Sequence, residues 1–358
     1  MVQVLPPRQH PGAQGTARGN PGRDVSGAWH HQRMKMPRIP HEVMAMLTPA
    51  LGRVVERSAR GETLMMWGLR PHPADPGTPM SLDEADGYEE KIPEGVARTV
   101  AFPIMNATDA LSTTNLLITN AARSTPMNHH TPAFLALCRT AIECSSQAIW
   151  AMCPEDRSVR RARAAGLAKI GIEHARDYHA DAISAHDNGL LKLPEITYKQ
   201  SQHRRKFHQG ELDELAKLSP QNARKYTELV RKAANWIEGH PPVHTNETSM
   251  VHFPTIAQSQ YRQCSSFTHG HSWPIDLVQG PTAMFKMMAD SINTALLTTE
   301  VAVCLFEAQS TDPNGSRENF YPPRLQPTID AWRELYLAAT EDSPPSEPIA
   351  EPEPPQAS

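Results

Sequence analysis

The sequence predicts an all-α protein: an antiparallel helical bundle with a disordered N-terminal arm and a disordered, acidic C-terminal tail. Several long segments repeat apolar residues at helical spacing, and no stretch alternates for long enough to be a convincing strand. The two ends differ in composition from the rest. Residues 1–37 carry basic residues, prolines and glycines without apolar periodicity, and residues 341–358 carry prolines and acids without a base. Such segments bury too little apolar surface to fold.

Composition limits the classes of function. The formal net charge is -4, so an anionic partner must be met by a local basic patch. The 5 cysteines include no CxxC spacing, which predicts buried thiols in a reducing cytoplasm. The leader has no apolar stretch of the signal-peptide type, and the apolar run 295–306 is interrupted by polar residues. We therefore expect a buried helix there, a cytoplasmic protein and no membrane partner.

The N-terminal region, residues 38–104, predicts one amphipathic helix followed by a long loop. Apolar residues keep helical spacing from Pro40 to Gly61. Prolines then recur through residues 68–104, which predicts a loop with one short helix at Ser81–Tyr88. Besides Met1, Met34 and Met36 are candidate translation starts.

The central region, residues 105–309, predicts most of the bundle. We expect helices over Asp109–Arg123, Phe134–Met152, Pro154–Ala185, Ser219–Gly239, Pro254–His269 and Thr282–Gln309. A polar connection, Lys192–Gly210, separates two of them, and its basic run His203–His208 with one aromatic suggests either a mobile loop or a single-strand contact. Residues 310–340 add a loop and a last helix, Ile329–Ala338.

Two groups of charged residues precede the main motif. Arg139 and Glu143 stand four positions apart in the predicted core helix, where an ion pair serving the fold is the first interpretation and a catalytic role the second. Arg157, Arg160 and Arg161 crowd the first turns of the next helix. They form either a solvated face or a rim that contacts RNA phosphates.

The main motif lies near the end of the helix predicted over Pro254–His269. Arg262 and His269 are seven positions apart, so they share one helix face and are separated by about 10 Å along it. A long Arg and an imidazole at that spacing can grip one phosphodiester. Ser265 and Ser266 lie between them.

These residues resemble the Arg-x4-6-His motif of the HEPN superfamily of helical RNases and nucleotide-binding domains. The wider pattern, which also resembles a set of uncharacterised, actinobacterial-type proteins, spans about residues 105 to 308. It consists of Arg139 to Glu143, Trp150, Arg157, Arg161 and the segment from Tyr261 to Gly270.

The resemblance implies metal-independent cleavage of RNA by a homodimer, as in toxins and antiphage effectors. Arg262 would steady the scissile phosphate, and His269 would move protons as the ribose 2′-OH attacks and the 5′-oxygen leaves. The helix dipole favours a protonated His269, which suits a general acid. The chain has 17 histidines, but no Cys or carboxylate stands at a known ligand spacing, so no metal or cofactor is expected.

The alternative is a non-catalytic helical binding or assembly module whose partner is a protein or a nucleotide, whereas a toxin would have an antitoxin as its partner. Gln263 follows the arginine, where active HEPN members commonly carry Asn, Asp or His. In this alternative Arg262, Ser265 and His269 join Arg139 and Glu143 in a buried hydrogen-bond network that fixes helix packing.

Overall fold

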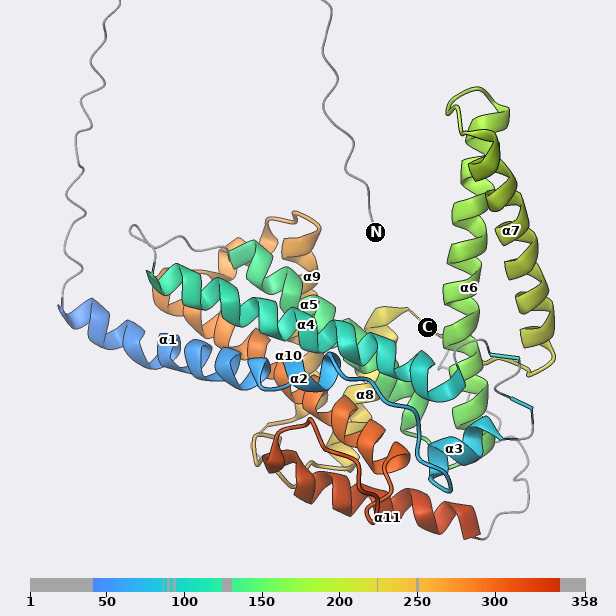
Figure 1. The fold of residues 1–358 in the computed structure, drawn as a ribbon. Helices are drawn as coiled ribbons and strands as arrows, with labels where there is room; N and C mark the ends of the chain where they lie inside the picture. The colour runs from blue at the N-terminus through green and yellow to red at the C-terminus, as the bar shows by residue number, and fades with distance from the viewer. Residues whose placement is uncertain are drawn as a thin grey trace, which may run out of the picture. The chain divides into compact units, whose positions relative to one another are not determined.

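A computed structural model of the chain describes residues 41–341, except 86, 89–90, 93–94, 124–130, 224 and 249–250. Every regular element in these residues is a helix, which confirms the all-α prediction (Figure 1). The described residues belong to one compact unit, His41–Ser358. The arm predicted over 1–37 lies outside the described residues, and so does the tail predicted over 341–358 except for Glu341, which is the last residue of a helix.

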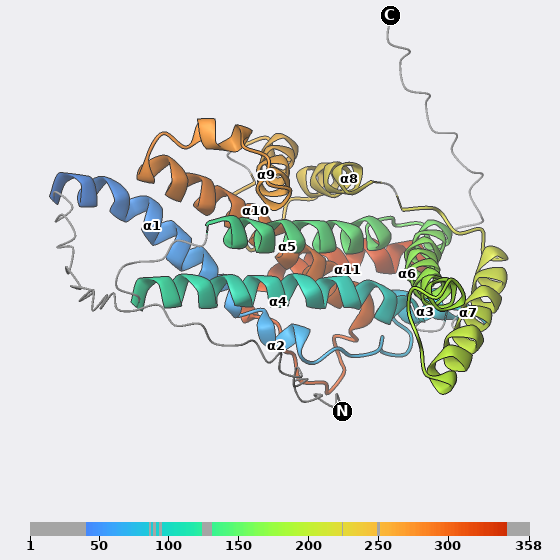
Figure 2. The ribbon, with the colours of Figure 1, turned by 90° about the horizontal axis from the view of Figure 1, so that it is seen from above.

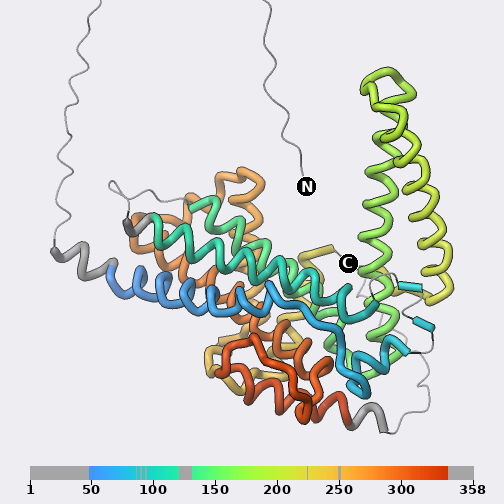
Figure 3. The backbone as a smooth tube through the Cα atoms, viewed as in Figure 1, coloured from blue at the N-terminus to red at the C-terminus, as the bar shows by residue number. Residues whose placement is uncertain are grey.

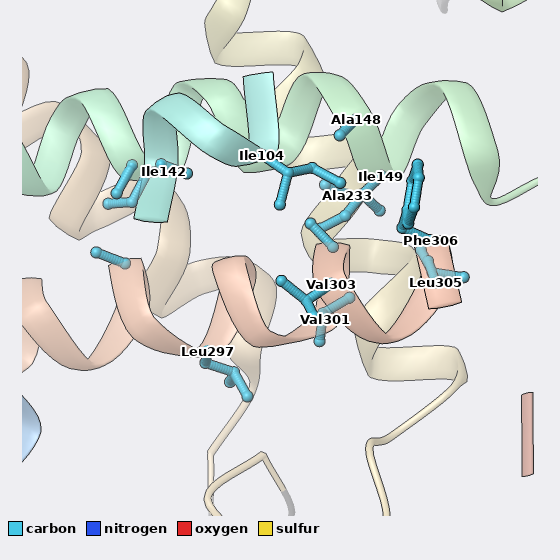
Figure 4. Close-up of a cluster of buried hydrophobic side chains, with 14 of the residues drawn as sticks. Ile104, Ile142, Ala148, Ile149, Ala233, Leu297, Val301, Val303, Leu305 and Phe306 are labelled. Atoms are coloured by element: carbon cyan, nitrogen blue, oxygen red, sulfur yellow. The ribbon is translucent and has the colours of Figure 1, made fainter. Parts of the chain in front are cut away.

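Helix α10, Pro281–Ser310, forms the core of this unit. Every residue from Thr294 to Ser310 is buried, because α10 packs against α1 (His41–Glu62), α4 (Gly95–Arg123) and α5 (Thr131–Met152). α4 and α5 lie side by side (Figure 2), and their aliphatic side chains meet those of α10 (Figure 4). Among the described residues, α10 is one helix whose length and composition would suit a membrane span, but 89% of that window is buried inside the fold.

The remaining helices cover this core or extend from it. α8 (Tyr226–Gly239) and α9 (Phe253–Thr268) pack on α5, and α11 (Gln326–Glu341) packs on α10. The short elements are α2 (Met65–Gly68), α3 (Pro79–Glu84), η1 (Trp273–Leu277) and η2 (Pro323–Leu325). α6 (Arg157–Asp187) and α7 (Glu195–Ala216) pair as a long hairpin that stands out from the bundle (Figures 1 and 3).

The predicted loop over 68–104 is shorter than expected, because α4 begins at Gly95 and runs through Pro103. A proline inside a helix removes one backbone hydrogen bond. Packing offsets that loss here, since Val96, Val100 and Ile104 are all buried on one face. The boundary expected between residues 104 and 105 therefore falls inside a helix.

The predicted connection over Lys192–Gly210 is also wrong, because most of it belongs to α7. The hairpin exposes most of the girth of α7, so few positions have to be apolar and the helical period is weak. α8 ends at Gly239 as predicted but begins only at Tyr226, because the chain from Ser219 first crosses α6, where Gln221 donates its N–H to the Ala162 carbonyl. The helices expected over Phe134–Met152, Pro254–His269 and Thr282–Gln309 are confirmed within a few residues.

Candidate functional site

The candidate site is built on α9, which presents one apolar and one polar face. Phe253, Ala257, Tyr261 and Cys264 are buried at helical spacing. Arg262 follows Tyr261 by about 100° around the helix and is exposed. The polar residues of the motif therefore face outward.

The carboxyl end of α9 is fixed by a Schellman motif. Gly270 has a φ of 70°, a conformation that glycine adopts without a Cβ penalty. Its N–H donates to the Phe267 carbonyl at 3.2 Å, and the His271 N–H donates to the Ser266 carbonyl at 2.9 Å. These bonds end the helix at Thr268 and place His269 at the C-cap. The imidazole is exposed, 6.0 Å between ring centroids from His271.

Neither Arg262 nor His269 is sealed in the core. Both are exposed, and neither side chain makes a hydrogen bond or ion pair with any residue in the described part of the chain. Ser265 is half-buried between them, and its carbonyl accepts from the His269 N–H at 3.0 Å. The Arg262 guanidinium and the His269 imidazole are thus both open to solvent, one on the last turns of α9 and the other at its C-cap, a spacing that corresponds to about 10 Å along an ideal helix.

Arg139 and Glu143 on α5 meet Tyr261 on α9. Arg139 Nε donates to Glu143 Oε1 at 2.9 Å, and the Tyr261 hydroxyl donates to the same oxygen at 2.8 Å. Burial, and then the hydrogen bond to Glu143, raise the pKa of Tyr261 to about 12. The two halves of the sequence pattern are therefore joined in space, although Glu143 and Tyr261 are 118 positions apart.

The buried network expected in the alternative interpretation has different members. Tyr261 completes it with Arg139 and Glu143, whereas Arg262 and His269 are exposed, because Tyr261 lies on the buried face of α9. Ser266 is buried, and its hydroxyl accepts a hydrogen bond of 2.8 Å from Trp273 Nε1. This bond holds η1 against α9.

Arg160, expected at an RNA-facing rim, is buried and 3% exposed. Its Nε and Nη2 atoms donate to the two Asp83 oxygens at 2.7 and 2.9 Å, and Nη1 donates to the carbonyls of Pro154 and Glu155. A guanidinium with this set of partners has no free face for phosphate. The placement of Arg160 among RNA contacts is therefore corrected to a structural role.

Arg157 and Arg161 hold the same neighbouring segment. Arg157 donates to the Leu82 carbonyl and lies 3.7 Å from Asp83. Arg161 donates to the Ala85 carbonyl at 3.2 Å and lies 4.4 Å above the Tyr88 ring. The arginines at the start of α6 thus anchor α3 and the residues after it. No local sequence pattern indicates this partner, because Asp83 lies 77 positions from Arg160.

Two buried carboxylates on α10 were also not anticipated. Glu300 Oε2 lies 2.9 Å from His244 Nε2, and Glu300 Oε1 lies 2.6 Å from Arg324 Nη2. Seven residues on, Glu307 accepts from Trp67 Nε1 at 2.6 Å and from Thr311 Oγ1 at 2.6 Å, and lies 2.9 Å from His72 Nε2. Each carboxylate is almost fully enclosed and ties α10 to segments distant in sequence.

The Glu300 cluster contains a hydroxyl, an imidazole and a carboxylate in line. Thr328 Oγ1 lies 2.8 Å from His244 Nδ1, on the opposite side of the ring from Glu300. The backbone N–H of His244 also donates to Thr328 Oγ1 at 3.0 Å. Thr328 is 0% exposed and so is the His244 side chain, so no substrate reaches this hydroxyl. The arrangement stabilises the fold.

Comparison with protein-family models, curated proteins and solved structures found no match. In the described ranges, no group of three or more His, Cys, Asp or Glu residues is placed to hold a metal ion.

Proposed function

We propose that this protein is a metal-independent endoribonuclease of the HEPN type, in which Arg262 binds the scissile phosphate and His269 transfers a proton. The observation that supports this most is that both side chains are exposed at the carboxyl-terminal end of α9 and make no hydrogen bond or ion pair with a described residue. A guanidinium is a fixed fork for phosphate oxygens, and an imidazole titrates near neutrality. The pair is therefore available to a shared anion.

In the proposed reaction the ribose 2′-oxygen forms a bond to phosphorus and loses its proton to water. The bond from phosphorus to the 5′-oxygen breaks, and His269 gives that oxygen a proton. Arg262 stabilises the charge on the phosphoryl oxygens. The products are a 2′,3′-cyclic phosphate and a 5′-hydroxyl, and neither step uses a metal ion.

Cleavage is tested with purified protein and 5′-labelled RNA in the presence of EDTA. His269→Ala should lower the rate by about 100-fold or more, the usual contribution of a general acid. Arg262→Gln should lower it by a similar factor, and Arg262→Lys should not restore it, because lysine lacks the planar fork. His252→Ala is the matched control, since His252 is an exposed histidine beside the first residue of the same helix.

A cellular test uses the same variants expressed in a bacterial host, with growth and total RNA as readouts. Wild type and His252→Ala should slow growth and degrade RNA, and His269→Ala should do neither. Equal growth and intact RNA in all three strains would end the ribonuclease proposal. A toxin or antiphage role, with a protein antagonist in the cytoplasm, belongs to the same proposal.

The second candidate is a non-catalytic assembly module, favoured by the apolar surface of η1 next to His269. Trp273, Ile275 and Leu277 are 45%, 61% and 52% exposed. Exposed apolar patches of this kind mark protein contacts. A homodimer through this segment would serve either function, so light scattering on wild type and Ile275→Glu tests association separately from cleavage. A monomeric wild type would remove the homodimer from both proposals.

A further inference from the structure

Helix α7 carries a basic segment that the Arg262 and His269 proposal does not use. Between Glu195 and Glu211 the helix contains four Lys or Arg residues and no acid: Lys199, Arg204, Arg205 and Lys206. All four are exposed. Lys199 pairs with Glu195 at 2.9 Å, whereas the other three make no hydrogen bond or ion pair with residues that the structure describes. We call Arg204, Arg205 and Lys206 the basic triplet.

The triplet lies on the projecting hairpin of α6 and α7 (Figure 1). α7 turns Ser201, Leu212 and Leu215 inward and leaves the triplet outside. Three consecutive helical residues point about 100° apart. They therefore cannot converge on one small anion, but they can meet several phosphates of a strand that follows the helix surface.

Two open grooves lie beside the triplet, and Lys206 lines both. The first, of about 760 Å³, also contains Arg205 and Arg176, and the second, of about 640 Å³, contains His203 and Phe207. Phe207 is 50% exposed. An exposed aromatic ring beside free cations is the combination that holds single-stranded nucleic acid, through base stacking and phosphate contacts.

The acids that line the grooves already have partners. In the first, Asp177 accepts from Arg176 at 2.8 Å and Asp187 accepts from the Tyr198 hydroxyl at 2.8 Å. In the second, Glu211 lies 2.7 Å from His208 Nδ1 and Glu214 lies 2.6 Å from Lys217 Nζ. Asp177 and Glu214 are thus paired with cations, and Asp187 and Glu211 are held by hydrogen bonds to a hydroxyl and an imidazole, whereas the triplet pairs with no described carboxylate.

From this arrangement we infer that α7 is a binding surface for single-stranded RNA, with the basic triplet on the phosphates and Phe207 under a base. The inference rests on the proposed function in taking RNA as the partner. It adds a surface that holds the strand away from the Arg262 and His269 pair. An acidic protein segment would satisfy the charges but would leave Phe207 without a role.

Binding is measured by fluorescence anisotropy with the full chain and a labelled 2′-O-methyl oligouridine of about twenty nucleotides. This probe has no free 2′-OH and cannot be cleaved by the proposed reaction. A failure of catalysis therefore leaves the binding result intact, and the reverse holds as well. Circular dichroism checks that each variant remains helical.

The test variant is Arg204→Gln, Arg205→Gln and Lys206→Gln combined, and the control combines Arg53→Gln, Arg231→Gln and Lys286→Gln. The control residues are exposed on α1, α8 and α10, and both changes remove equal charge. Glutamine is a good helix former, so α7 should remain folded. In about 0.05 M salt the triplet variant should bind the probe at least tenfold more weakly than wild type. The salt slope, which is the slope of the logarithm of the binding constant against the logarithm of the salt concentration, should be smaller in magnitude by about 2. The control variant should match wild type in both.

Phe207→Leu separates stacking from charge. It should weaken binding by roughly tenfold with an unchanged salt slope, because stacking does not release counterions. The inference is overturned if wild type does not bind the probe, if the triplet variant binds as wild type does, or if both triple variants weaken equally. An oligoglutamate peptide that binds as tightly as the RNA would also overturn it, in favour of an acidic protein partner.

Discussion

Replacing Glu300 with glutamine tests how much a buried negative charge in the core contributes to the stability of this protein. Glu300 is 0% exposed and lies 2.6 Å from Arg324, 3.6 Å from Arg60 and 2.9 Å from His244. Glu300→Gln keeps the shape of the side chain and an oxygen that can accept from His244. It removes the negative charge that faces two guanidinium groups.

The size of the loss in the free energy of unfolding depends on how exposed the charged partners of Glu300 are. Removing one member of a fully buried ion pair costs about 3–5 kcal/mol, because the other charge is left without compensation. The Arg60 side chain is 28% exposed and recovers part of its hydration, whereas both terminal nitrogens of Arg324 are buried, so the loss should lie at or just below the lower end of that range. We therefore expect Glu300→Gln to lower the free energy of unfolding by about 2–3 kcal/mol.

Urea unfolding followed by far-UV circular dichroism measures this loss as a shift in midpoint. Glu214→Gln is the matched control, since Glu214 also lies 2.6 Å from its partner, Lys217, but these side chains are 53% and 60% exposed. The control should cost less than about 0.5 kcal/mol. A loss at Glu300 no larger than that of the control would refute the argument that burial sets the cost.

The same comparison predicts a pH dependence. Burial alone would raise the pKa of Glu300, but the hydrogen bond from His244 and the charge of Arg324 outweigh it and lower the pKa below 4.5. A lowered folded pKa means that this stabilisation is complete above the unfolded value and disappears as the pH falls through the folded value. The stability difference between wild type and Glu300→Gln should be full near pH 7 and shrink below about pH 4.

Three further predictions use the same unfolding and titration methods. Gly166→Ala would place a Cβ 1.8 Å from the Gln221 carbonyl oxygen and should lower the free energy of unfolding by about 2–3 kcal/mol. Gly171→Ala, where a Cβ would meet nothing within 4 Å, should raise the free energy of unfolding by about 0.5–1 kcal/mol. A change of the same sign in both variants would contradict the packing of α6. Burial raises the pKa of all five free thiols, so Ellman's reagent should label them quickly only after unfolding, and rapid labelling of the native protein would be inconsistent with this structure. Tyr261→Phe should lower the free energy of unfolding by about 1–2 kcal/mol, because it removes the hydrogen bond to Glu143. Its ultraviolet titration should coincide with that of wild type up to about pH 10, because the pKa of Tyr261 is raised to about 12.

The helices that the sequence predicts best are those that are buried along one apolar face or on all sides. α5, α9 and α10 were placed within a few residues because their apolar positions repeat at helical spacing. α7 was missed because a projecting hairpin helix buries only a narrow face. The start of α4 was missed because Pro103 indicated a loop, whereas burial of its neighbours decided the outcome.

The candidate site was predictable only in its local part. The spacing of Arg262 and His269 on one helix, and of Arg139 and Glu143 on another, follows from helical geometry. The bond from Tyr261 to Glu143 depends on how α5 packs on α9, and no local pattern encodes that contact. The same holds for Arg160, whose partner Asp83 comes from a separate helix.

The charged groups of this protein divide into two sets with different consequences for mutation. Asp83, Glu300 and Glu307 are enclosed and lie in ion-pair range of arginine or histidine side chains, so changing them alters stability first. Arg262, His269 and the basic triplet are exposed and make no hydrogen bond or ion pair with a described residue, so they contribute little to folding. Replacing any of the second set should change RNA cleavage or binding, while the free energy of unfolding measured in urea stays within about 0.5 kcal/mol of wild type. Loss of activity with a large loss of stability would instead mean that these surfaces pack against something in the native assembly.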